Sequence, residues 1–121
     1  MIYGIGIDII EIKRFEHILL KQRFLSKVYG VKELEYLLLK KKKESFAANF
    51  CAKEAFAKAL GTGTRGFKLN EVQVLRNDSG KPYYKLDGAA LKLAQKANIT
   101  FSLSISHSKQ YATAVAIAEI I

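Results

Sequence analysis

Two acidic residues and one lysine have the types and spacing to do chemistry together. Asp8 lies near the end of an otherwise apolar segment, and Glu54 and Lys58 are four residues apart, which places them on one face of a helix. If the carboxylates of Asp8 and Glu54 meet in the fold, they can hold a hard cation such as Mg²⁺, which takes oxygen ligands and shares them with substrate phosphates. The spacing alone does not establish that they meet.

Each of these residues also has a purely structural interpretation. Glu54 and Lys58 can form an exposed ion pair that stabilises a helix by about 0.2–0.5 kcal/mol, and their spacing alone favours this interpretation. Asp8 can cap a following helix, because aspartate commonly ends a strand and starts a helix. The residues by themselves leave both alternatives open.

Three further sites deserve the same comparison. Gly61, Thr62 and Gly63 could cradle a phosphate, because glycines let backbone N–H groups approach an anion. Taken alone the segment is more typical of a helix cap and turn, and it is not a P-loop, because no Gly-Lys-Ser/Thr follows it. His107 follows an alternating segment, a place typical of a hydrogen-bonded turn residue. Cys51, the only cysteine, is expected to be a small buried hydrophobic residue and not a nucleophile.

A strand and several helices must position these groups. Isoleucines alternate with Gly6 and Asp8 over residues 2–10, which predicts a strand. From Glu11 to Leu25 the apolar residues have helical spacing, so we expect a basic helix directly after this strand. The same spacing predicts two more helices: one over 31–41, closed by the lysines at 40–43, and one over 46–60, capped by Gly61.

The second half of the chain adds a hairpin, a helix and two strands. Residues 72–75 and 83–86 flank the turn segment 77–80, which is the pattern of a β-hairpin. A short helix over 89–97 and strands over 100–106 and 112–118 follow. This order favours an α+β fold in which an antiparallel sheet packs against helices.

Composition limits the classes of protein to which the chain can belong. Its 121 residues fit one domain, 1–121, and half of them are hydrophobic, as in globular proteins. The net charge of +9 attracts phosphates, nucleic acids or acidic proteins. No apolar run approaches the roughly 20 residues that span a bilayer, and the first residues lack a basic leader and a cleavage site. We therefore expect a cytoplasmic protein with no membrane partner.

Four segments in fixed order resemble the holo-[acyl-carrier-protein] synthase family of 4'-phosphopantetheinyl transferases. The resemblance covers nearly the whole chain, and it rests on Gly4-Ile5-Gly6-Ile7-Asp8 with Arg14-Phe15, on Phe50-Cys51-Ala52-Lys53-Glu54-Ala55 through Lys58 to Gly61-Thr62-Gly63, on Gly80-Lys81-Pro82, and on Ser104-Ile105-Ser106-His107-Ser108. Four segments in order are far less common by chance than any one of them.

The resemblance implies a site and a set of ligands. Asp8 and Glu54 would bind Mg²⁺ together with the pyrophosphate of coenzyme A, and Lys58 would offset charge beside the reacting phosphate. The residues implied to contact the co-substrate coenzyme A are Lys53, Gly61, Thr62, Gly63, Lys81 and His107. Asn49 is a departure, because related sequences often carry arginine before Phe50, and it is expected to remove one positive contact to the nucleotide phosphates.

The resemblance also implies a reaction and its partners. The 4'-phosphopantetheine of coenzyme A would move to a serine of apo-acyl carrier protein, giving holo-acyl carrier protein and 3',5'-ADP and supporting fatty acid biosynthesis. Glu54, directly or through a metal-bound water, is the candidate acceptor of the serine proton. Because acyl carrier proteins are acidic, Arg14, Lys21 and Arg23 would form their landing face. The family further implies a homotrimer with each coenzyme A site between neighbouring subunits.

Two other classes of protein compete with this interpretation. A small nucleic-acid-binding domain would account for the charge of +9 and would bind more weakly as salt rises. It gives no reason for the segments around Asp8 and Glu54, so we expect no nucleic-acid partner. A coenzyme A-binding module without catalysis would bind the nucleotide but never release 3',5'-ADP.

Overall fold

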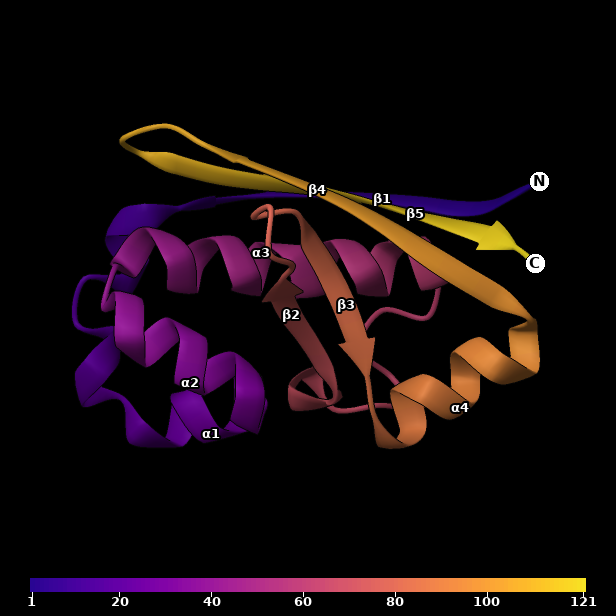
Figure 1. The fold of residues 1–121 in the computed structure, drawn as a ribbon, viewed down its shortest axis with the longest axis horizontal. Helices are drawn as coiled ribbons and strands as arrows, with labels where there is room; N and C mark the ends of the chain where they lie inside the picture. The colour runs from indigo at the N-terminus through magenta and orange to yellow at the C-terminus, as the bar shows by residue number, and fades with distance from the viewer.

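A three-stranded antiparallel sheet forms one layer of the molecule (Figure 1). The computed structural model describes all residues, 1–121, and the strand order is β1 (Ile2–Glu11), β5 (Tyr111–Ile120), β4 (Ile99–His107). Asp8 on β1 pairs with Ala114, and His107 on β4 pairs with Ala112. The two predicted site residues therefore lie on opposite edge strands, on either side of β5.

Helix α3 (Lys43–Leu60) lies directly against one face of this sheet (Figure 1). The contact is close because the facing side chains are small. Ala112, Ala114, Ala116 and Ala118 of β5 are at most 2% exposed. On β1, a Cβ atom at Gly6 would collide with the backbone carbonyl of Ala55, and Gly4 meets α3 in the same way. Glycine at these two places lets β1 approach the helix backbone.

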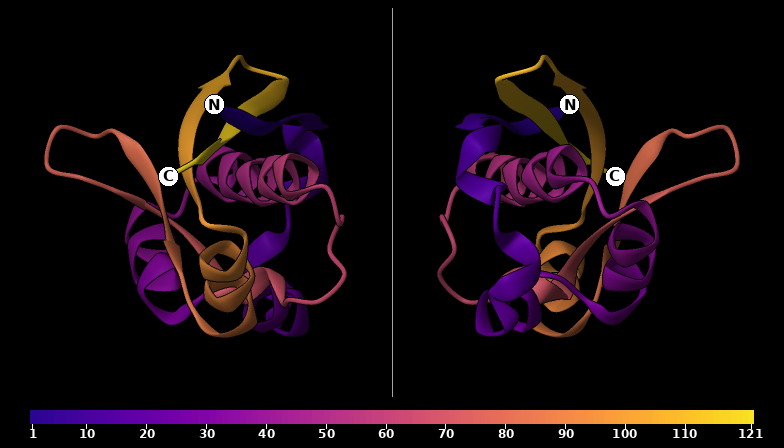
Figure 2. Two further views of the ribbon diagram at one scale, coloured as in Figure 1. Left: turned by 90° about the vertical axis from the view of Figure 1, so that its right-hand side faces the viewer. Right: turned by 90° about the vertical axis from the view of Figure 1, so that its left-hand side faces the viewer.

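Most of the remaining elements lie on the other side of α3 from the sheet, and the hairpin of residues 72–86 rises beside α3, so that α3 is the central element (Figure 2). None of the helices is long and apolar enough to cross a membrane. In chain order these elements are the 3₁₀ turns Ile12–Phe15 and Ile18–Leu20, α1 (Gln22–Val28), α2 (Val31–Lys40), the 3₁₀ turn Leu69–Glu71, the hairpin of β2 (Val72–Arg76) and β3 (Pro82–Leu86), and α4 (Gly88–Ala97).

The α+β class and the antiparallel sheet are confirmed, as are the hairpin, the helices over 31–40, 43–60 and 88–97 and the last two strands. The hairpin forms a separate two-stranded sheet. The single helix expected over 11–25 is wrong. The segment forms two 3₁₀ turns and the short α1 instead, because the backbone leaves helical geometry at His17 (φ −113°, ψ 30°) and at Lys21 (φ −101°, ψ 70°). The apolar residues Ile12, Phe15 and Ile18 are still buried in the core.

Two expectations about charged residues also need correction. Asp8 lies inside β1, which continues to Glu11, and no side chain caps the turn that follows, so Asp8 is not a helix cap. The lysine run does not simply close α2. Lys40 ends α2, Lys41 takes a left-handed conformation with φ 53°, and Lys43 begins α3. The run therefore also surrounds the N-terminus of α3.

The outer face of the three-stranded sheet carries no other element. Ile5, Ile7 and Ile9 of β1 point to this face and are 59%, 63% and 65% exposed. They pair across the strands with Ile117, Val115 and Thr113 of β5, which are half-buried. A contiguous apolar surface of this kind marks an interaction site in soluble proteins.

Candidate active site

Asp8 and Lys58 are brought together from β1 and the last turn of α3. The Lys58 ammonium donates to the carbonyl oxygen of Ile7 at 2.9 Å and to Asp8 Oδ1 at 3.2 Å. The Asp8 side chain is 19% exposed and that of Lys58 is 54% exposed, so the pair lies at the surface with the lysine outermost. Lys58 thus pairs with Asp8 across two elements, and the expected Glu54–Lys58 ion pair along the helix is wrong.

Glu54 lies on the same side of α3, one turn before Lys58, and is half-buried. Burial raises the pKa of the Glu54 carboxyl, the negative charge of Asp8 raises it further, and Lys58 partly offsets both effects. The two carboxylates therefore lie close enough to repel each other. A site with this property favours a cation, because a cation between the carboxylates replaces repulsion with attraction.

The donor set fits Mg²⁺. Asp8 and Glu54 offer carboxylate oxygens, and no third His, Cys, Asp or Glu side chain joins them in a cluster. Mg²⁺ in enzymes that act on phosphates is typically held by one or two carboxylates, with the remaining positions taken by water and substrate phosphates. Two carboxylates with an open side next to Lys58 match that pattern.

Cys51 forms the inner wall of this site and is chemically inert. It is fully buried, and its thiol donates weakly to the carbonyl oxygen of Ala112 at 3.6 Å. Burial, with a smaller contribution from the negative charge of Asp8, raises the pKa of the thiol to about 12. The thiol is neutral at physiological pH, which confirms that Cys51 acts as a small hydrophobic residue.

The glycine-rich segment begins three residues after Lys58. Gly61 has φ 90° and its N–H donates to the carbonyl oxygen of Ala57 at 3.0 Å, so it is the left-handed cap of α3 that the sequence predicts. Gly63 also has positive φ, 62°, and residues 61–66 are exposed. The loop thus leads away from the Asp8–Glu54–Lys58 cluster with its backbone open to a ligand, and its contact with a phosphate stays a prediction.

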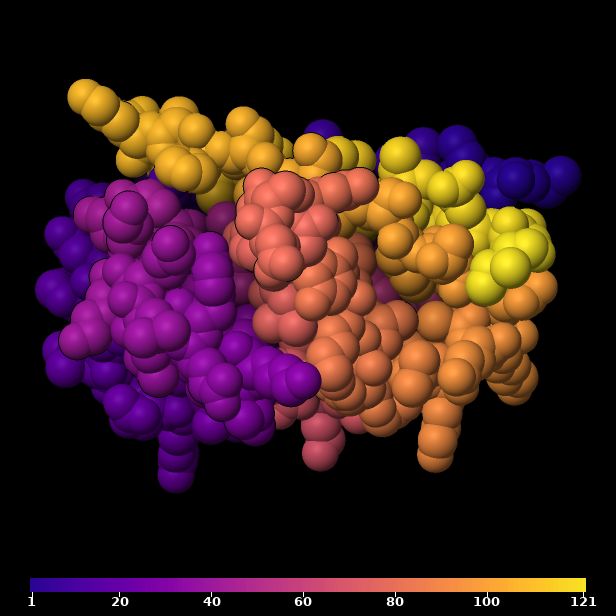
Figure 3. All heavy atoms as spheres, in the orientation of Figure 1, coloured from indigo at the N-terminus to yellow at the C-terminus, as the bar shows by residue number.

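His107 and Lys81 lie elsewhere, beside the N-terminal half of α3. His107 lines a cavity of about 260 Å³ together with Gly80, Pro82 and Arg76, and Lys81 lies between the two lining residues of the hairpin turn. The hairpin, the end of α2 and the β4–β5 turn meet on one face of the molecule (Figure 3). Because adjacent strands are about 4.8 Å apart, this face is separated from the Asp8 cluster by the full width of the sheet.

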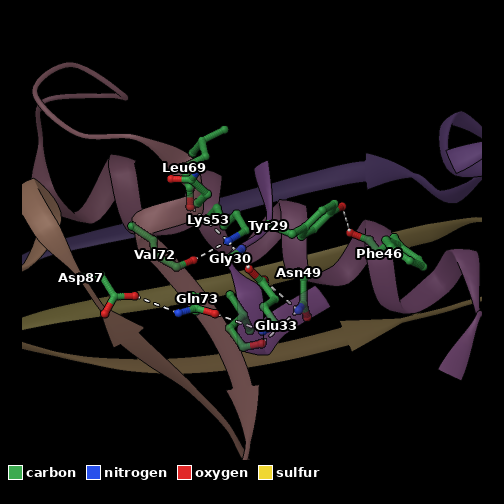
Figure 4. A network of polar contacts seen from close by, with 12 residues as sticks. Tyr29, Gly30, Glu33, Phe46, Asn49, Lys53, Leu69, Val72, Gln73 and Asp87 are labelled. Carbon is green, nitrogen blue, oxygen red and sulfur yellow. Dashed lines mark hydrogen bonds and ion pairs between the residues drawn. The ribbon is translucent and has the colours of Figure 1, made fainter. Parts of the chain in front are cut away.

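Lys53 does not reach either site. Its side chain is fully buried, and its ammonium donates to Glu33 Oε1 at 2.6 Å, to the carbonyl oxygen of Leu69 at 3.1 Å and to that of Val72 (Figure 4). All three ammonium protons are therefore used inside the protein. The expected contact between Lys53 and coenzyme A has no place in this arrangement, because the group is enclosed by the core and fully hydrogen-bonded.

The buried pair belongs to a network that joins α2, α3 and β2 (Figure 4). Asn49 is fully buried and its amide donates to Glu33 Oε2 at 2.9 Å and to the carbonyl oxygen of Val74 at 3.0 Å. Gln73 accepts from the Glu33 N–H at 3.0 Å and donates to Asp87 at 2.8 Å. Burial raises the pKa of Glu33 and lowers that of Lys53, while each charge counteracts the effect on the other. The role of this network is structural.

The basic residues expected to receive a partner protein are only partly assembled. Arg14 and Lys21 line a cavity of about 160 Å³ with three aromatic rings, Phe15, Phe24 and Phe50. The rings of Phe15 and Phe24 lie 5.7 and 5.8 Å from that of Phe50. Arg23 is exposed on α1 and does not line this cavity. The sequence reasoning predicted the charges but missed the aromatic floor, although the spacing of Phe15 and Phe24 was visible.

Sequence reasoning missed another group of residues altogether. The cavity next to His107 continues into a larger one of about 610 Å³, and the cations around the two are Arg76, Lys40, Lys42 and Lys109. The lysine run was the only signal in the sequence, and it was interpreted as a helix end. No signal in the sequence pointed to Arg76, because it meets α3 only when the hairpin folds against that helix.

Comparison with known proteins identifies close relatives. The family model of the 4'-phosphopantetheinyl transferase superfamily matches residues 4–116. A holo-[acyl-carrier-protein] synthase of Fusobacterium nucleatum is 46% identical over 120 residues, covering 97% of this chain and 98% of that protein. The crystal structure of holo-[acyl-carrier-protein] synthase from Neisseria meningitidis is similar with a TM-score of 0.90 and 35% identity, covering 98% of this chain and 99% of that chain.

A further similar structure contains a ligand. It is the holo-(acyl-carrier-protein) synthase of Bacillus anthracis in complex with CoA (3',5'-ADP), with a TM-score of 0.83 and 34% identity, covering 100% of this chain and 99% of that chain. Both the sequence and the fold of this chain are therefore shared over essentially their full length with proteins of one named activity.

Proposed function

The chain belongs to the 4'-phosphopantetheinyl transferase superfamily, and on this premise we propose that it transfers 4'-phosphopantetheine from coenzyme A to a serine of apo-acyl carrier protein. The relatives named holo-[acyl-carrier-protein] synthase support the reaction, and the ligand of the Bacillus anthracis structure supports coenzyme A as the donor. The observation that carries the proposal is a surface cluster of three residues. Lys58 contacts Asp8, and the half-buried Glu54 lies close enough for the negative charge of Asp8 to raise its pKa.

Asp8 and Glu54 would hold Mg²⁺ through their carboxylate oxygens. When bound, Mg²⁺ would neutralise the pyrophosphate of coenzyme A and stabilise 3',5'-ADP as it leaves. The two carboxylates are held in fixed relative positions, because β1 and α3 are packed against each other by the close contacts at Gly4 and Gly6. The proposal accounts for two like charges placed side by side, which a purely structural role leaves unexplained.

Lys58 would stabilise the charge that develops on the transferred phosphate. Its ammonium is more than half exposed while held by Ile7 and Asp8, so it can contact a substrate without leaving its anchor. A compact ammonium acts as a point charge, and preorganised charge of this kind is a major source of rate acceleration. The loop at Gly61, Thr62 and Gly63 follows within one turn and would contact the nucleotide side.

The nucleophile would come from the carrier protein. Its serine oxygen forms a bond to the phosphorus attached to pantetheine, the bond from that phosphorus to the bridging oxygen of the pyrophosphate breaks, and the electron pair leaves with 3',5'-ADP. Glu54 is the candidate acceptor of the serine proton, because it is the carboxylate that lies on α3 one turn from Lys58.

The complete site would be formed between copies of the chain in a homotrimer. The Asp8 cluster and the face with His107 and Lys81 lie at opposite edges of one sheet, so a neighbouring subunit could supply the second face to a coenzyme A bound at the Asp8 cluster. The exposed Ile5, Ile7 and Ile9 on the uncovered sheet support such an assembly. Apolar surface of this extent on an edge strand is typically covered by a partner.

The carrier protein would dock on Arg14, Lys21 and Arg23. Arg14 and Lys21 flank the aromatic cavity, so an acidic partner could combine charge pairing with one inserted apolar side chain. Charge complementarity raises the encounter rate more than the final affinity. By analogy with the family, we assign the reaction to fatty acid biosynthesis in the cytoplasm.

The test is product formation. Purified protein is incubated with apo-acyl carrier protein, coenzyme A and Mg²⁺, and the carrier protein is weighed by intact mass spectrometry while 3',5'-ADP is measured in the same mixture. The proposal predicts a phosphopantetheine mass gain with equimolar 3',5'-ADP. Binding of coenzyme A without either product, tested with several carrier proteins, would instead support a binding module without catalysis.

A further inference from the structure

The outer face of α2 exposes apolar side chains that the rest of the chain does not cover. Val31 is 76% exposed, Leu39 is 86% exposed and their neighbour Leu38 is 43% exposed. Residues seven and eight positions apart lie on one helix face, and the opposite face of α2 packs into the protein through Glu33 and Leu37, which are fully buried. Single exposed apolar residues are common, but three on one face of a 10-residue helix form a contiguous patch.

Exposed lysines border this apolar patch. Lys32 lies on α2 itself, and the lysines at 40–43 begin directly after Leu39. None of these lysines takes part in an ion pair. Lys41 has a left-handed backbone conformation, which turns the run from the end of α2 to the start of α3. Glu35 is the only exposed carboxylate of α2, so the positive charge beside the patch is concentrated and mostly uncompensated.

The chemistry of this surface fits a lipid bilayer better than a protein or a nucleic acid. The three apolar side chains line neither of the two cavities beside α2, so they protrude and offer no groove to a protein partner. An acidic protein finds charge together with an aromatic cavity at Arg14 and Lys21. A nucleic acid gives no reason for Val31 and Leu39, because it pairs phosphates with lysines and stacks bases on aromatic rings. An anionic bilayer needs no pocket, because it accepts protruding apolar side chains next to lysines.

We propose that the outer face of α2 and its lysines bind the surface of an anionic phospholipid bilayer. Val31, Leu38 and Leu39 enter the boundary between headgroups and acyl chains, and the lysines contact lipid phosphates. Surface binding needs neither a spanning helix nor a leader, the two features whose absence predicts no membrane partner from the sequence. The sheet lies on the opposite side of α3 from α2 (Figure 1), so a bound chain keeps its uncovered sheet face free. The inference goes beyond the proposed function and does not depend on it.

The lysines and the apolar side chains contribute to binding in different ways. Each lysine near an anionic surface should raise the partition coefficient about fivefold, and this contribution weakens as salt shortens the Debye length. A leucine that enters the acyl boundary should raise the partition coefficient about tenfold, and this contribution does not need charge. The proposed surface therefore requires both an anionic lipid and Leu39 for full binding.

The experiment is co-sedimentation of the purified protein with sucrose-loaded vesicles. Wild type should sediment with vesicles of equal parts phosphatidylcholine and phosphatidylglycerol, stay in solution with phosphatidylcholine alone, and be released by added salt. Leu39→Ser should lower the partition coefficient about 10-fold and Lys41→Gln about 5-fold. The matched controls should sediment as wild type. They are Leu20→Ser, which removes a leucine that is 81% exposed outside α2, and Lys96→Gln, an equal loss of charge on exposed α4.

A second measurement reports whether position 39 itself enters the bilayer. The chain contains no tryptophan, so the variants Leu39→Trp and Leu20→Trp each carry a single indole fluorophore. The emission of Leu39→Trp should shift to shorter wavelength with the anionic vesicles and should be quenched by brominated lipid. The emission of Leu20→Trp should stay unchanged under both conditions.

Three results would overturn the proposal. One is wild type that stays in solution with the anionic vesicles at low salt, and another is sedimentation that Leu39→Ser leaves unchanged. The third is a chain that ignores vesicles but binds apo-acyl carrier protein less tightly after Leu39→Ser, measured by calorimetry, which would assign the face to an acidic protein. The vesicle measurements need no substrate and no turnover, so their outcome is independent of whether transfer is detected.

Discussion

Lys58 lies at the end of the central helix, and its ammonium is held at the surface of the candidate site. It is anchored by the carbonyl of Ile7 and by Asp8 but remains half exposed. An ion pair at such a place contributes about 0–1 kcal/mol to stability. The same ammonium next to a reacting phosphate can contribute far more to the rate, because it needs no reorganisation during the reaction.

Lys58→Ala should therefore lower kcat about 10²- to 10³-fold and change the free energy of unfolding by no more than about 1 kcal/mol. Initial rates of holo-carrier protein formation and urea unfolding curves measure the two effects. Lys58→Arg, which keeps the charge but not the compact ammonium, should recover only part of the rate. A fully active Lys58→Ala enzyme would remove Lys58 from the proposed chemistry.

Single residues also mark the limit of the sequence reasoning. Spacing placed Glu54 and Lys58 on one helix face but left the meeting with Asp8 open, and only the family motif implied it. The motif was misleading for Lys53, because its position in the motif says nothing about the direction of its side chain, which here points into the core. Arg76 is 27 residues from Asn49 in sequence, so no local pattern could have paired them.

At the scale of elements, the buried Glu33–Lys53 pair fixes α2 to α3 and β2. Both side chains are fully buried, and the pair is completed by Asn49 and Gln73. Breaking such a pair leaves one buried charge without compensation, which costs about 3–5 kcal/mol.

Lys53→Met should lower the free energy of unfolding at neutral pH by about 3–5 kcal/mol. The loss should shrink as the pH falls. Burial already raises the pKa of Glu33, and without Lys53 this pKa rises further, so the folded state binds a proton that the unfolded state releases. The variant therefore loses stability as the pH rises from the pKa of Glu33 in the unfolded state to its higher pKa in the folded state, and the stability is regained below both values. Urea unfolding across the acidic to neutral range measures this dependence.

The matched control is Lys85→Met, which breaks a 2.6 Å pair with Asp87 in which both side chains are about 40% exposed. This exposed pair should cost about 0–1 kcal/mol. Equal losses in the two variants, or a Lys53→Met loss that does not change with pH, would contradict the role given to the buried network.

The elements themselves were predictable where local chemistry and tertiary packing agree. The hairpin has its turn residues, α3 has its glycine cap with φ 90°, and β5 has its alternation of buried alanines. The segment 11–25 was misread because periodic apolar residues reach the core from two 3₁₀ turns as well as from a helix. The uncovered face of the sheet does not follow from the sequence either, since the alternating isoleucines over residues 2–10 predict only a strand.

At the scale of the whole molecule, the two groups of predicted site residues lie at opposite edges of the sheet. A site shared between subunits predicts that two inactive variants can complement each other. Asp8→Asn and His107→Ala should each transfer slowly alone. After mixing and subunit exchange they should regain about a quarter of wild-type activity, because a random trimer forms about one intact pairing in four.

The control for this complementation is Ile7→Lys, placed on the exposed face of β1. A lysine there should prevent assembly, giving monomers by light scattering, and should abolish complementation while the chain stays folded. Each parent variant mixed with itself gives the baseline. If the mixture stays at the activity of the parents although exchange is shown by mass labelling, the site lies within one subunit.

The proposed metal-binding pair is tested by the Mg²⁺ dependence of transfer in Asp8→Asn and Glu54→Gln, read as the mass gain of apo-acyl carrier protein, with Lys96→Gln as the control. Wild type and Lys96→Gln should transfer only with Mg²⁺. Both carboxylate variants should lose at least about 10²-fold in rate, with part of the loss recovered at higher Mg²⁺. Transfer at the wild-type rate by either variant, or by wild type without a divalent cation, would contradict the assignment of Asp8 and Glu54 as the metal-binding pair.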